Sequence, residues 1–589
     1  MRHLAGCRFA ILAVRSALGQ RVCLNVRLAH GLAPGPAPGL TLAVALGIAT
    51  VGCGAEPQVD LAADVDRDEI VDFDRDEAGE DVWTADRGAI FLNNNDSDED
   101  SGAPDHADAV VNGPGDLADL AVLRLRQIPN LPPDSRLEIS VDDASRSRVR
   151  LFYRGEDGAY LALGSEGDHV NPMALRDGDL ALRIEASSYA DASWSGEVLV
   201  TASVSTPDGA LGSDSVRLRV APFLLLSNLN AGRTLYVREF PQRNDLFLVQ
   251  LEELVPTAGA ELEVVPAGEP YPEANIWLQD TMEIGYSEMP GQRMNVVLKA
   301  NRDRPLDGVA HDRLLGPDYG WFSCGSFRPE LRDRERRNRW LDWYGNLEVS
   351  PAVPGFPVGR VYYGANGDES LNPEIVALLD AQGAQAPAVR FDTGWLLIKH
   401  VDEIVAFVPS GSAEHPHKVL VPDTGLMLEL IEGWVAAGKG DLSVLQPYEG
   451  NATLASLTAD EDLVQHNRSL QTDRIDPNVE LLQREFGLRA EDIIRIPAML
   501  TAEGTSLFPN MVNSVVLNGH LLVSDPHGPE VDGRDLLQEY VRDLLADLPL
   551  EVHFLDDRVY HAWGGNTHCA TNVRRDGADE PWWILAAER

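Results

Sequence analysis

The reactive side chains of the sequence gather in its C-terminal part, in four short segments: residues 275–286, 343–350, 399–403 and 565–575. Taken singly, a cysteine or a His-x-Asp triplet most often serves packing or hydrogen bonding. Taken together, Cys569, His400 and the aspartates Asp280 and Asp402 supply a nucleophile, an acid and two anions. This set fits attack on the carbon of a guanidinium group, because that planar cation needs a thiolate, carboxylates that grip its N–H fork and an acid that expels ammonia.

The length and composition predict a folded protein with more than one core. At 589 residues the chain exceeds the usual size of one domain, and its 44% hydrophobic and 24% charged residues are typical of globular proteins. With 93 acidic against 49 basic residues, the net charge is −44, which argues against nucleic acid as a partner. The same charge either attracts cations and basic polypeptides or simply keeps the surface solvated.

Residues 1–53 have the features of an export signal. Five arginines and no acidic residue accompany an apolar stretch over residues 40–52, and Cys53 follows at once. This ending resembles a bacterial lipoprotein signal, in which the cysteine is lipidated. We therefore expect an exported protein that is anchored to a membrane only through Cys53, with cleavage and secretion as the alternative.

Two further cysteines, Cys324 and Cys569, lie in the body of the chain. In an exported protein the two could form a disulfide. A solitary reactive thiol is an equally natural interpretation, because two distant cysteines do not make a disulfide framework.

The elements that must position these residues fall into two regions, which together predict an α+β multidomain protein. Short runs with β-type alternation, separated by Gly, Asp and Pro clusters, predict an immunoglobulin-like β-sandwich over 61–222. Later, apolar strands alternate with amphipathic helices, which predicts an α/β region. The clearest strands are 148–153, 196–204 and 214–220 in the first region and 234–237, 296–298 and 395–398 in the second, and the clearest helices are 245–254, 373–381 and 534–545.

The four reactive segments resemble those of the protein-arginine deiminases, calcium-dependent enzymes of the pentein superfamily that convert peptidyl arginine to citrulline. Further matching stretches are 316–320, 508–513 and the tryptophan pair 582–583. The resemblance implies a five-bladed α/β-propeller catalytic domain over 223–589, preceded by an immunoglobulin-like, calcium-binding module over 61–222.

Carried over position by position, the resemblance implies that Asp280 and Asp402 bind the substrate guanidinium. It makes His400 the general acid and Cys569 the nucleophile. The implied reaction begins with thiolate attack and loss of ammonia, which leaves a covalent thiouronium intermediate. Water then hydrolyses this intermediate to citrulline.

Two further matches concern the substrate. Trp277 corresponds to an aromatic wall along the substrate side chain, and Arg304 to an arginine that binds the substrate's peptide backbone. Arg304 favours arginine in proteins or peptides as the substrate. The alternatives are free arginine or small guanidino compounds and, from a different class, a calcium-binding surface lipoprotein without catalysis.

The resemblance also implies a calcium site beside the catalytic residues. Its ligands are side-chain oxygens and backbone carbonyls, which calcium prefers, from Gln279, Glu283, Glu348, Tyr344 and Leu347.

A second calcium site of the family lacks its usual ligands, because Thr281, Lys299 and Ala300 stand where oxygen-bearing side chains are expected. We expect the Lys299 ammonium to replace that ion's charge. Lys399 is a further departure, since the family has glycine there, and a cation beside His400 would alter access or lower the pKa of that histidine.

The N-terminal module has its own candidate calcium site. It is formed by short acidic side chains, which are good calcium ligands, at Asp64, Asp66, Asp68, Asp96 and Asp98, with Asp318 contributed by the catalytic region. Glu69 stands where an EF-hand loop would have its turn glycine. A solvated charge run is the alternative.

Overall fold

The computed structural model describes residues 59–587, apart from 99–101, 164–168, 273–274, 330, 332–337 and 445–451. The predicted export signal, with Cys53, lies outside the described residues. Among the helices that are described, none has the length and apolar character of a membrane span.

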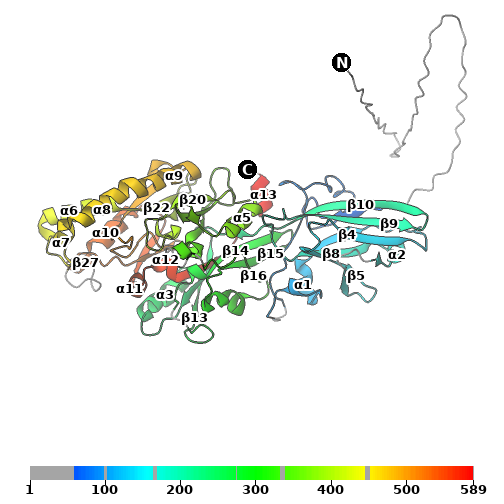
Figure 1. Ribbon diagram of the computed structural model, residues 1–589, viewed down its shortest axis with the longest axis horizontal. Helices are drawn as coiled ribbons and strands as arrows, with labels where there is room; N and C mark the ends of the chain where they lie inside the picture. The colour runs from blue at the N-terminus through cyan, green and yellow to red at the C-terminus, as the bar shows by residue number, and fades with distance from the viewer. Residues whose placement is uncertain are drawn as a thin grey trace, which may run out of the picture. The chain divides into compact units, whose positions relative to one another are not determined.

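The first region is built from two five-stranded sheets (Figure 1). Its strands are β1 Leu61–Ala63, β2 Ala89–Phe91, β3 Ala121–Leu125, β4 Arg136–Val141, β5 Val149–Arg154, β6 Tyr160–Ala162, β7 His169–Val170, β8 Leu180–Ala186, β9 Glu197–Thr206 and β10 Gly209–Val220. Its short helices are η1 Asp105–Ala107, α1 Gly113–Asp119 and α2 Ala174–Asp177. The sheet orders are β1-β3-β8-β5-β6 and β2-β10-β9-β4-β7. The predicted strands 148–153, 196–204 and 214–220 are confirmed as β5, β9 and β10.

The two sheets enclose one apolar core. Buried and half-buried residues alternate along β9, so one face of the strand packs inward and the other meets solvent. Both sheets contribute to a single cluster of buried side chains, which includes Phe91, Leu182, Val200 and Leu218. This is the layered arrangement of a β-sandwich.

The second region contains five sheets of three or four strands and one short hairpin. Its strands are β11 Leu224–Leu225, β12 Gly232–Arg238, β13 Glu261–Val265, β14 Met282–Met289, β15 Gln292–Lys299, β16 Tyr319–Ser323, β17 Leu347–Val349, β18 Val361–Asn366, β19 Glu369–Ser370, β20 Val389–Asp392, β21 Ala406–Pro409, β22 His417–Asp423, β23 Ile493–Pro497, β24 Val515–Leu517, β25 His520–Ser524, β26 Glu530–Val531, β27 Arg534–Asp535, β28 Glu551–Leu555 and β29 Thr571–Arg575.

Helices connect and cover these sheets. The α-helices are α3 Asp245–Thr257, α5 Pro373–Gln382, α6 Thr424–Trp434, α7 Leu454–Ala459, α8 Glu461–Leu470, α9 Asp476–Phe486, α10 Leu536–Leu544, α11 Arg558–His561, α12 Thr567–Ala570 and α13 Trp582–Ala587. The shorter turns are 3-10 helices η2 Gln279–Thr281, η3 Pro305–Gly308, η5 Asn338–Asp342, η6 Tyr344–Asn346, η7 Val401–Glu403 and η10 Ala490–Asp492, and π-helices η4 Ala310–Leu314, η8 Val435–Lys439 and η9 Gln471–Ile475.

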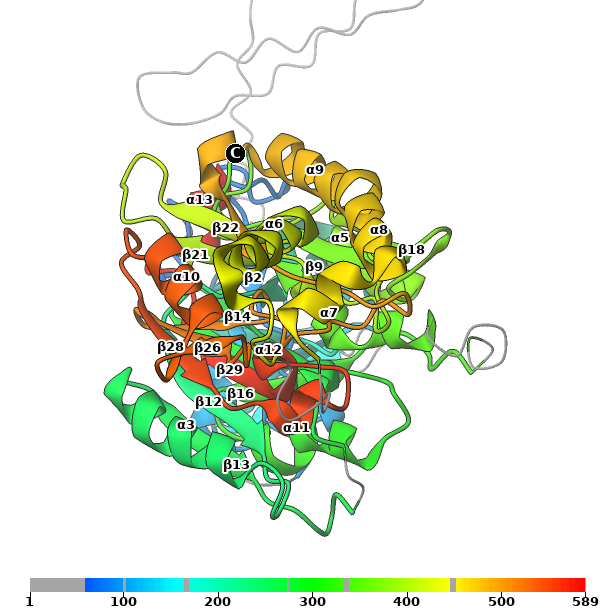
Figure 2. The same ribbon diagram turned by 90° about the vertical axis from the view of Figure 1, so that its left-hand side faces the viewer.

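Each of the five larger sheets repeats one pairing pattern. The central strands β12, β15, β18, β22 and β25 each pair antiparallel with at least one neighbour and parallel with another. Parallel neighbours require a crossover connection, and α3, α5 and α10 lie on three of these crossovers. Figure 2 shows α3, α9 and α10 toward the rim of the view and the strands inside them.

The predicted helices are confirmed, and their ends follow from capping residues. The side chain of Asn372 accepts from the Glu374 N–H at the start of α5, and Gly383 ends the helix with φ 83°. Helix α10 begins two residues later than predicted, because Asp535 caps it by accepting from the N–H groups of Leu537 and Gln538.

The predicted strand 395–398 is wrong. Strand β20 ends at Asp392, and the chain then turns, with the Trp395 indole donating to the Asp392 carbonyl at 2.9 Å. The Leu397 N–H donates to the carbonyl of Gly504, which belongs to no strand. The apolar residues 395–398 therefore form a turn that leads into His400.

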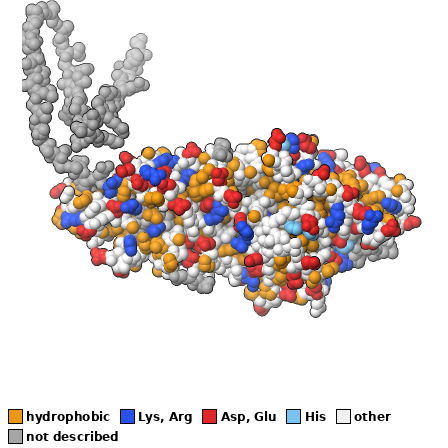
Figure 3. Space-filling view, turned by 180° about the vertical axis from the view of Figure 1, so that it is seen from behind, with side chains coloured by type: hydrophobic (Ala, Val, Ile, Leu, Met, Phe, Trp, Pro, Cys, Tyr) orange, Lys and Arg blue, Asp and Glu red, His pale blue; other side chains and the backbone are white. Residues whose placement is uncertain are grey.

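On the face shown in Figure 3, acidic side chains are spread among basic ones.

Candidate active site

Cys569 lies buried in α12, with polar groups around its thiol. The Asn513 amide nitrogen donates to Sγ at 3.2 Å, and the Asn513 oxygen accepts from the Cys569 N–H at 3.2 Å. Sγ in turn donates to Oδ2 of Asp402 at 3.4 Å. Both Cys324 and Cys569 are free thiols, so the alternative of a disulfide is wrong; Sγ of Cys324 instead faces the Glu374 carbonyl at 3.5 Å.

The buried carboxylate of Asp557 holds the segment that precedes Cys569. Its Oδ2 accepts from Ser524 Oγ at 2.6 Å, Asn566 Nδ2 at 2.9 Å and Thr567 Oγ1 at 3.3 Å. Burial raises the pKa of Asp557 to about 7, although these three donors act in the opposite direction. Because Ser524 is the last residue of β25, this network ties the loop before the nucleophile to a central strand.

Three reactive side chains converge on the backbone of Gly345, in η6. A Cβ atom on Gly345 would lie 2.5 Å from Nδ1 of His400 and 3.1 Å from both Asp280 Oδ1 and Asp402 Oδ2. Asp280 comes from η2, Asp402 from η7, and His400 stands at the start of η7. Since Asp402 Oδ2 also accepts from Sγ of Cys569, the structure brings together all four predicted catalytic residues.

The protonation of His400 follows from its neighbours. Its Nε2 lies 2.8 Å from the carbonyl oxygen of Trp340. Because a carbonyl can only accept, Nε2 carries the proton and Nδ1 of a neutral His400 is a free base. Nδ1 lies 3.5 Å from Asp280 Oδ1, so the base points into the space beside the carboxylates.

Three buried atoms of this cluster have no hydrogen-bond partner among the described residues: Asp280 Oδ1, Asp402 Oδ1 and His400 Nδ1. Buried polar atoms are nearly always paired in folded proteins. Unpaired acceptors on three side chains that meet at Gly345 therefore mark the place of a polar ligand with several N–H donors. A guanidinium, planar and cationic with five such donors, fits them.

The electrostatics of the site favour a neutral thiol before a cation arrives. Burial, with the negative charges of Asp402 and Asp280, raises the pKa of the Cys569 thiol well above its ordinary value. Burial likewise raises the pKa of Asp280, although His400 and Arg302 act against it. A positive charge between the two aspartates would reverse both effects.

Of the two predicted substrate-binding residues, Trp277 lies beside the nucleophile. A Cβ atom on Gly565 would come within 2.5 Å of the Trp277 ring and 3.2 Å of the Cys569 Cβ. Arg304 instead lines a broad hollow of ≈ 800 Å³ together with Lys299 and other polar residues. Trp277 and Cys569 thus flank Gly565, while Arg304 lines a different part of the surface.

Lys399 turns away from solvent. It is 5% exposed, has a left-handed φ of 70°, and its Nζ donates to the carbonyl of Leu396 at 3.4 Å. The Lys399 side chain is therefore buried against the turn that precedes His400.

Two residues of the site were not assigned from the sequence. Asn513 contacts the Cys569 thiol, as described above. His568 donates through Nδ1 toward Asp402 Oδ2 at 2.9 Å, and its Nε2 lies 3.4 Å from Glu348 Oε1. Burial alone would lower the pKa of His568, but Glu348 and Asp402 raise it. The only sequence signals were the stretch that ends at Asn513 and the position of His568 next to the cysteine.

Three of the five predicted calcium ligands line a small cavity of ≈ 30 Å³. Gln279, Glu283 and Glu348 line it, together with His568 and Arg575. The pKa of Glu283 is raised well above its ordinary value, by burial and by Glu348, and burial raises that of Glu348 to about 7.

The oxygen atoms of this cavity fit a hard cation. Oε1 of Glu348 is buried and has no hydrogen-bond partner among the described residues. The Gln279 amide lies 3.4 Å from the Tyr344 carbonyl, so that carbonyl also faces the ligand set, and Leu347 directly precedes Glu348. Calcium is coordinated by such a combination of carboxylate, amide and carbonyl oxygens.

At the altered second site, the cation that reaches Thr281 is Arg302. Its Nη2 donates to Thr281 Oγ1 at 2.8 Å, and its Nε donates to Asp307 at 2.7 Å. Nη1 lies 3.8 Å from Asp280 Oδ2, and the Arg302 side chain is fully buried. Lys299 instead has its ammonium 5.9 Å from the ring centre of Trp321.

The acids of the N-terminal module fall into two clusters rather than the one expected. One consists of Asp64, Asp66 and Asp76, and the other of Asp96, Asp98 and Asp119. Asp76 and Asp119 come from outside the two motifs that the sequence singled out, and they join through folding of the chain. Asp68 instead pairs with Arg75 at 2.5 Å.

Asp318 joins the second cluster from the catalytic region. Its N–H donates to Asp96 Oδ2 at 2.9 Å, and Gln292 donates to both Asp119 and Asp318, at 2.6 and 2.7 Å. Burial and the neighbouring acids raise the pKa of Asp96 to about 8 and that of Asp119 to about 9.

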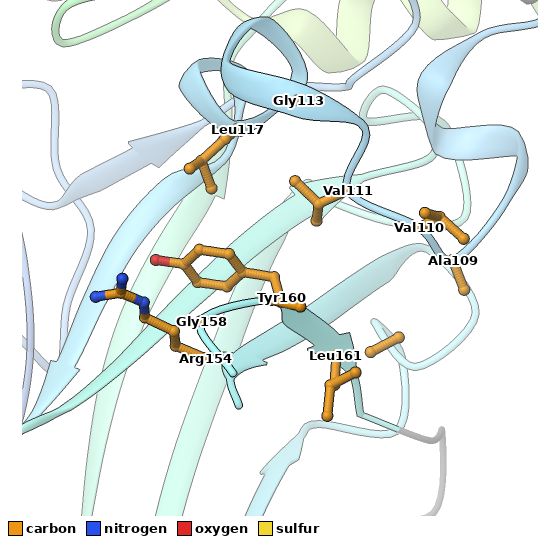
Figure 4. A pocket seen from close by; sticks show the side chains of 11 residues that line it. Ala109, Val110, Val111, Gly113, Leu117, Arg154, Gly158, Tyr160 and Leu161 are labelled. Atoms are coloured by element: carbon orange, nitrogen blue, oxygen red, sulfur yellow. The ribbon is translucent and has the colours of Figure 1, made fainter. Parts of the chain in front are cut away.

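A second large hollow lies in the sandwich, away from these groups (Figure 4). It measures ≈ 700 Å³ and is lined by Val110, Tyr160 and Leu161, with Arg154 at one side. None of the predicted catalytic residues lines it.

The fold and the site together define a buried cysteine centre shaped for a planar cation, and comparison with known proteins gives its family. The profile described as "Protein-arginine deiminase (PAD)" matches residues 210–584, and that of the "Protein-arginine deiminase (PAD) middle domain" matches residues 58–207. The chain belongs to the protein-arginine deiminase family.

Individual relatives agree with this assignment. The chain is 32% identical to protein-arginine deiminase type-4 of Rattus norvegicus over 540 residues, which cover 86% of this chain and 79% of that protein. It is 32% identical to the type-3 protein of Homo sapiens, over 85% of this chain and 78% of that protein.

Among solved structures, an agmatine deiminase of C. jejuni aligns with 60% of this chain and 96% of its own, at 11% identity and a TM-score of 0.36. An inosamine-phosphate amidinotransferase of Streptomyces griseus covers 62% and 99% respectively, at 14% identity and a TM-score of 0.33.

Proposed function

We propose that the protein hydrolyses arginine side chains of proteins or peptides to citrulline and ammonia, with Cys569 as the nucleophile. The observation that carries this proposal is the set of unpaired acceptors on Asp280, Asp402 and His400 next to a buried thiol. Family membership supports the same reaction. A binding protein without catalysis has no need of a nucleophile, a base and two carboxylates around one point.

The first chemical step follows from the charges. The substrate guanidinium enters between Asp280 and Asp402, and its positive charge lowers the pKa of the Cys569 thiol. The proton of the thiol leaves by way of Asp402 Oδ2, which Sγ faces, to the free Nδ1 of His400. The thiolate then attacks the guanidinium carbon and forms a tetrahedral adduct.

His400 also carries the protons of the remaining steps. His400 protonates the departing nitrogen, ammonia leaves, and an S-alkylthiouronium remains on Cys569. Neutral His400 then takes a proton from water, and the hydroxide adds to the same carbon. Collapse of this second adduct expels the thiolate and leaves citrulline protonated on oxygen. That proton passes to solvent or to the released ammonia, and His400 returns the proton that it took from water to sulfur.

Arg304 and the broad hollow that it lines support a peptide substrate over free arginine, because an open, polar surface can accommodate a polypeptide backbone. The hollow is also lined by Asp307, whose partner Arg302 lies 3.8 Å from Asp280 Oδ2. Deimination of free arginine or small guanidino compounds is the second candidate. The ratio of the two activities distinguishes them.

Calcium is proposed as the ion of the small cavity. Gln279, Glu283 and Glu348 would hold it, with the carbonyls of Tyr344 and Leu347. When bound, calcium supplies positive charge that compensates the buried glutamates and orders the segment that includes Asp280. For the altered second site, Arg302 is a better candidate than Lys299 for the compensating charge, since it contacts Thr281.

The larger architecture is proposed to be that of the family. The five sheets with one pairing pattern support a five-bladed propeller over 223–589, and the two facing sheets support an immunoglobulin-like module over 61–222. The two acidic clusters of that module are candidate calcium sites. We further propose that residues 1–53 direct export and that Cys53 carries a lipid anchor.

A citrulline assay tests the proposal. The purified protein is incubated with a blocked arginine peptide or with free arginine, with and without calcium, beside Cys569→Ala and the control Cys324→Ala. We expect calcium-dependent citrulline from the peptide, lost in Cys569→Ala and kept in the control. No citrulline from either substrate at millimolar calcium would overturn the proposal. Palmitate labelling of the full chain, compared with Cys53→Ala, tests the lipid anchor.

A further inference from the structure

Three side chains that ligate transition metals lie together on the sheet of β24, β25 and β28. His520 is the first residue of β25, and Glu551 and His553 lie on β28. The parallel register pairs His520 with Glu551 and Leu522 with His553. Because alternate residues of a strand face the same side, all three side chains project from one face of the sheet.

Their ligand atoms are close enough to share one ion. Nδ1 of His520 lies 2.9 Å from Nε2 of His553 and 3.9 Å from Glu551 Oε2. Nε2 of His553 lies 3.7 Å from Glu551 Oε1. Ligands that bind one ion through bonds of about 2.0–2.2 Å are themselves roughly 3–4 Å apart. Within the described part of the chain, this is the only such cluster that contains imidazole.

We propose that His520, Glu551 and His553 bind one divalent transition-metal ion of the zinc type. Two imidazole nitrogens and one carboxylate suit zinc and its neighbours, whereas calcium prefers oxygen ligands alone. The side chains of His520 and His553 are 16% and 23% exposed, and that of Glu551 is 70% exposed. One side of the site is therefore open to solvent, so water completes the coordination.

The backbone that carries these ligands is held in place. Asn518 donates to the carbonyls of Gly232 and Ala258, at 2.8 and 3.0 Å, and so fixes the start of β25 to β12 and to the end of α3. Arg542 of α10 donates to the Val552 carbonyl, between the two ligands of β28, at 2.8 Å. Figure 2 shows β28 between α10 and α3. Ligands on such strands are preorganised, which favours binding.

The charges around the site are mixed. Burial lowers the pKa of His553, and His520 and Arg542 lower it further, while Glu551 acts against them. A neutral imidazole is the form that binds a metal. The positive charge of Arg542 disfavours a metal ion nearby, and the negative charge of Glu551 offsets this repulsion.

The ion would stabilise the sheet rather than take part in the chemistry. His520 and Glu551 are the first residues of β25 and β28, and Ser524 and Leu555 are the last. At this last end, Ser524 donates to Asp557, which holds the segment before Cys569. Four residues of strand separate the two ends by about 13 Å. An ion here joins β25 to β28 at the end away from Cys569.

Zinc binding to the full-length protein tests this proposal. Metal-stripped protein competes with a chromogenic chelator for Zn²⁺ in millimolar calcium, which occupies oxygen-rich sites. We expect wild type to bind one more equivalent of zinc than His520→Gln or His553→Gln, and zinc to raise the Tm of wild type but not of these two variants. His466→Gln, on α8, is the matched control and should behave as wild type.

Equal zinc stoichiometry in wild type and both histidine variants would overturn the proposal and leave only a hydrogen-bonded histidine pair. Because Glu551 is mostly exposed, Glu551→Gln preserves the fold and provides a second variant. We expect it to weaken zinc binding about tenfold or more through loss of one charged ligand. Unchanged affinity in Glu551→Gln would exclude the carboxylate from the site. Deimination by all of these variants should match that of wild type, so this test is independent of the proposed reaction.

Discussion

Asn513 contacts Cys569 twice: its amide nitrogen donates to Sγ and its oxygen accepts from the cysteine N–H, each at 3.2 Å. One side chain thus fixes the backbone of the nucleophile and donates to the atom that becomes negative. Its partner in this arrangement, Asp402, accepts from the thiol before reaction. Once ionised, the sulfur can no longer donate to Asp402, but it still accepts from the Asn513 amide.

Replacement of Asn513 by alanine should slow deimination. A hydrogen bond to a charged atom contributes about 1.5–3 kcal/mol, which corresponds to a decrease in kcat/KM of roughly 10- to 150-fold. Steady-state citrulline formation measures this. Asn171→Ala, in the sandwich, should leave the rate unchanged, and an equal rate in Asn513→Ala would show that the amide does not stabilise the thiolate.

Replacement of Gly345 by alanine should lower the rate of deimination strongly without unfolding the protein. The new Cβ would lie 2.5 Å from His400 Nδ1, so the imidazole and the carboxylates must separate. A displacement of about 1 Å can lower a rate about 100-fold. Kinetics and thermal unfolding separate the two effects. Gly433→Ala, which meets nothing within 4 Å, is the control; wild-type activity in Gly345→Ala contradicts the placement of the three groups.

The free protein should contain a neutral Cys569 thiol at neutral pH, because burial and two aspartates raise its pKa. Only the thiolate is alkylated, so the rate of iodoacetamide modification of Cys569 in calcium-free protein should rise about tenfold per pH unit from pH 7 to pH 9, without a plateau. Mass spectrometry of the Cys569 peptide gives the rate. A plateau below pH 8 would mean a thiolate that is already formed.

Replacement of Glu348 by glutamine should weaken calcium binding. Loss of one anionic ligand raises the Kd for calcium by roughly tenfold or more. Calorimetry and the calcium-dependent rise in Tm both report binding without relying on activity. The exposed Glu530→Gln is the matched control. If Glu348→Gln and wild type need the same calcium concentration, the ion is bound elsewhere.

Arg302 should be essential for stability. Arg302→Leu leaves the carboxylates of Asp307 and Asp280 without their buried cation, which destabilises by about 3–5 kcal/mol. Urea unfolding measures this. Arg468→Ala removes an exposed pair with Glu432, for which about 0–1 kcal/mol is expected; a similarly small loss in Arg302→Leu would contradict the role given to this guanidinium.

Local patterns predicted most of the elements. Strands such as β9 and helices such as α5 carry alternation or caps that depend only on neighbouring residues. The run 395–398 failed because its apolar side chains fill space beside a turn, and the partner that holds the turn, Gly504, is more than a hundred residues away in the chain. The local pattern of apolar residues does not indicate that contact.

The site was predicted to a similar extent. Asp280, His400, Asp402 and Cys569 converge, as the chemistry of the four residue types requires. Asn513 and His568 were missed, because an amide or a second histidine has a role only through its distance to a thiol or a carboxylate. The division of the module's acids into two clusters likewise depends on Asp76 and Asp119, which reach them through tertiary packing.

The proposed reaction requires Cys569 to form a covalent bond to the guanidinium carbon. Rapid acid quenching of the protein with a blocked arginine peptide and calcium, followed by tandem mass spectrometry, measures this most directly. We expect a thiouronium adduct on the Cys569 peptide, present in Cys324→Ala and absent in Cys569→Ala. Continued citrulline formation by Cys569→Ala, or an adduct on any other residue, would contradict it.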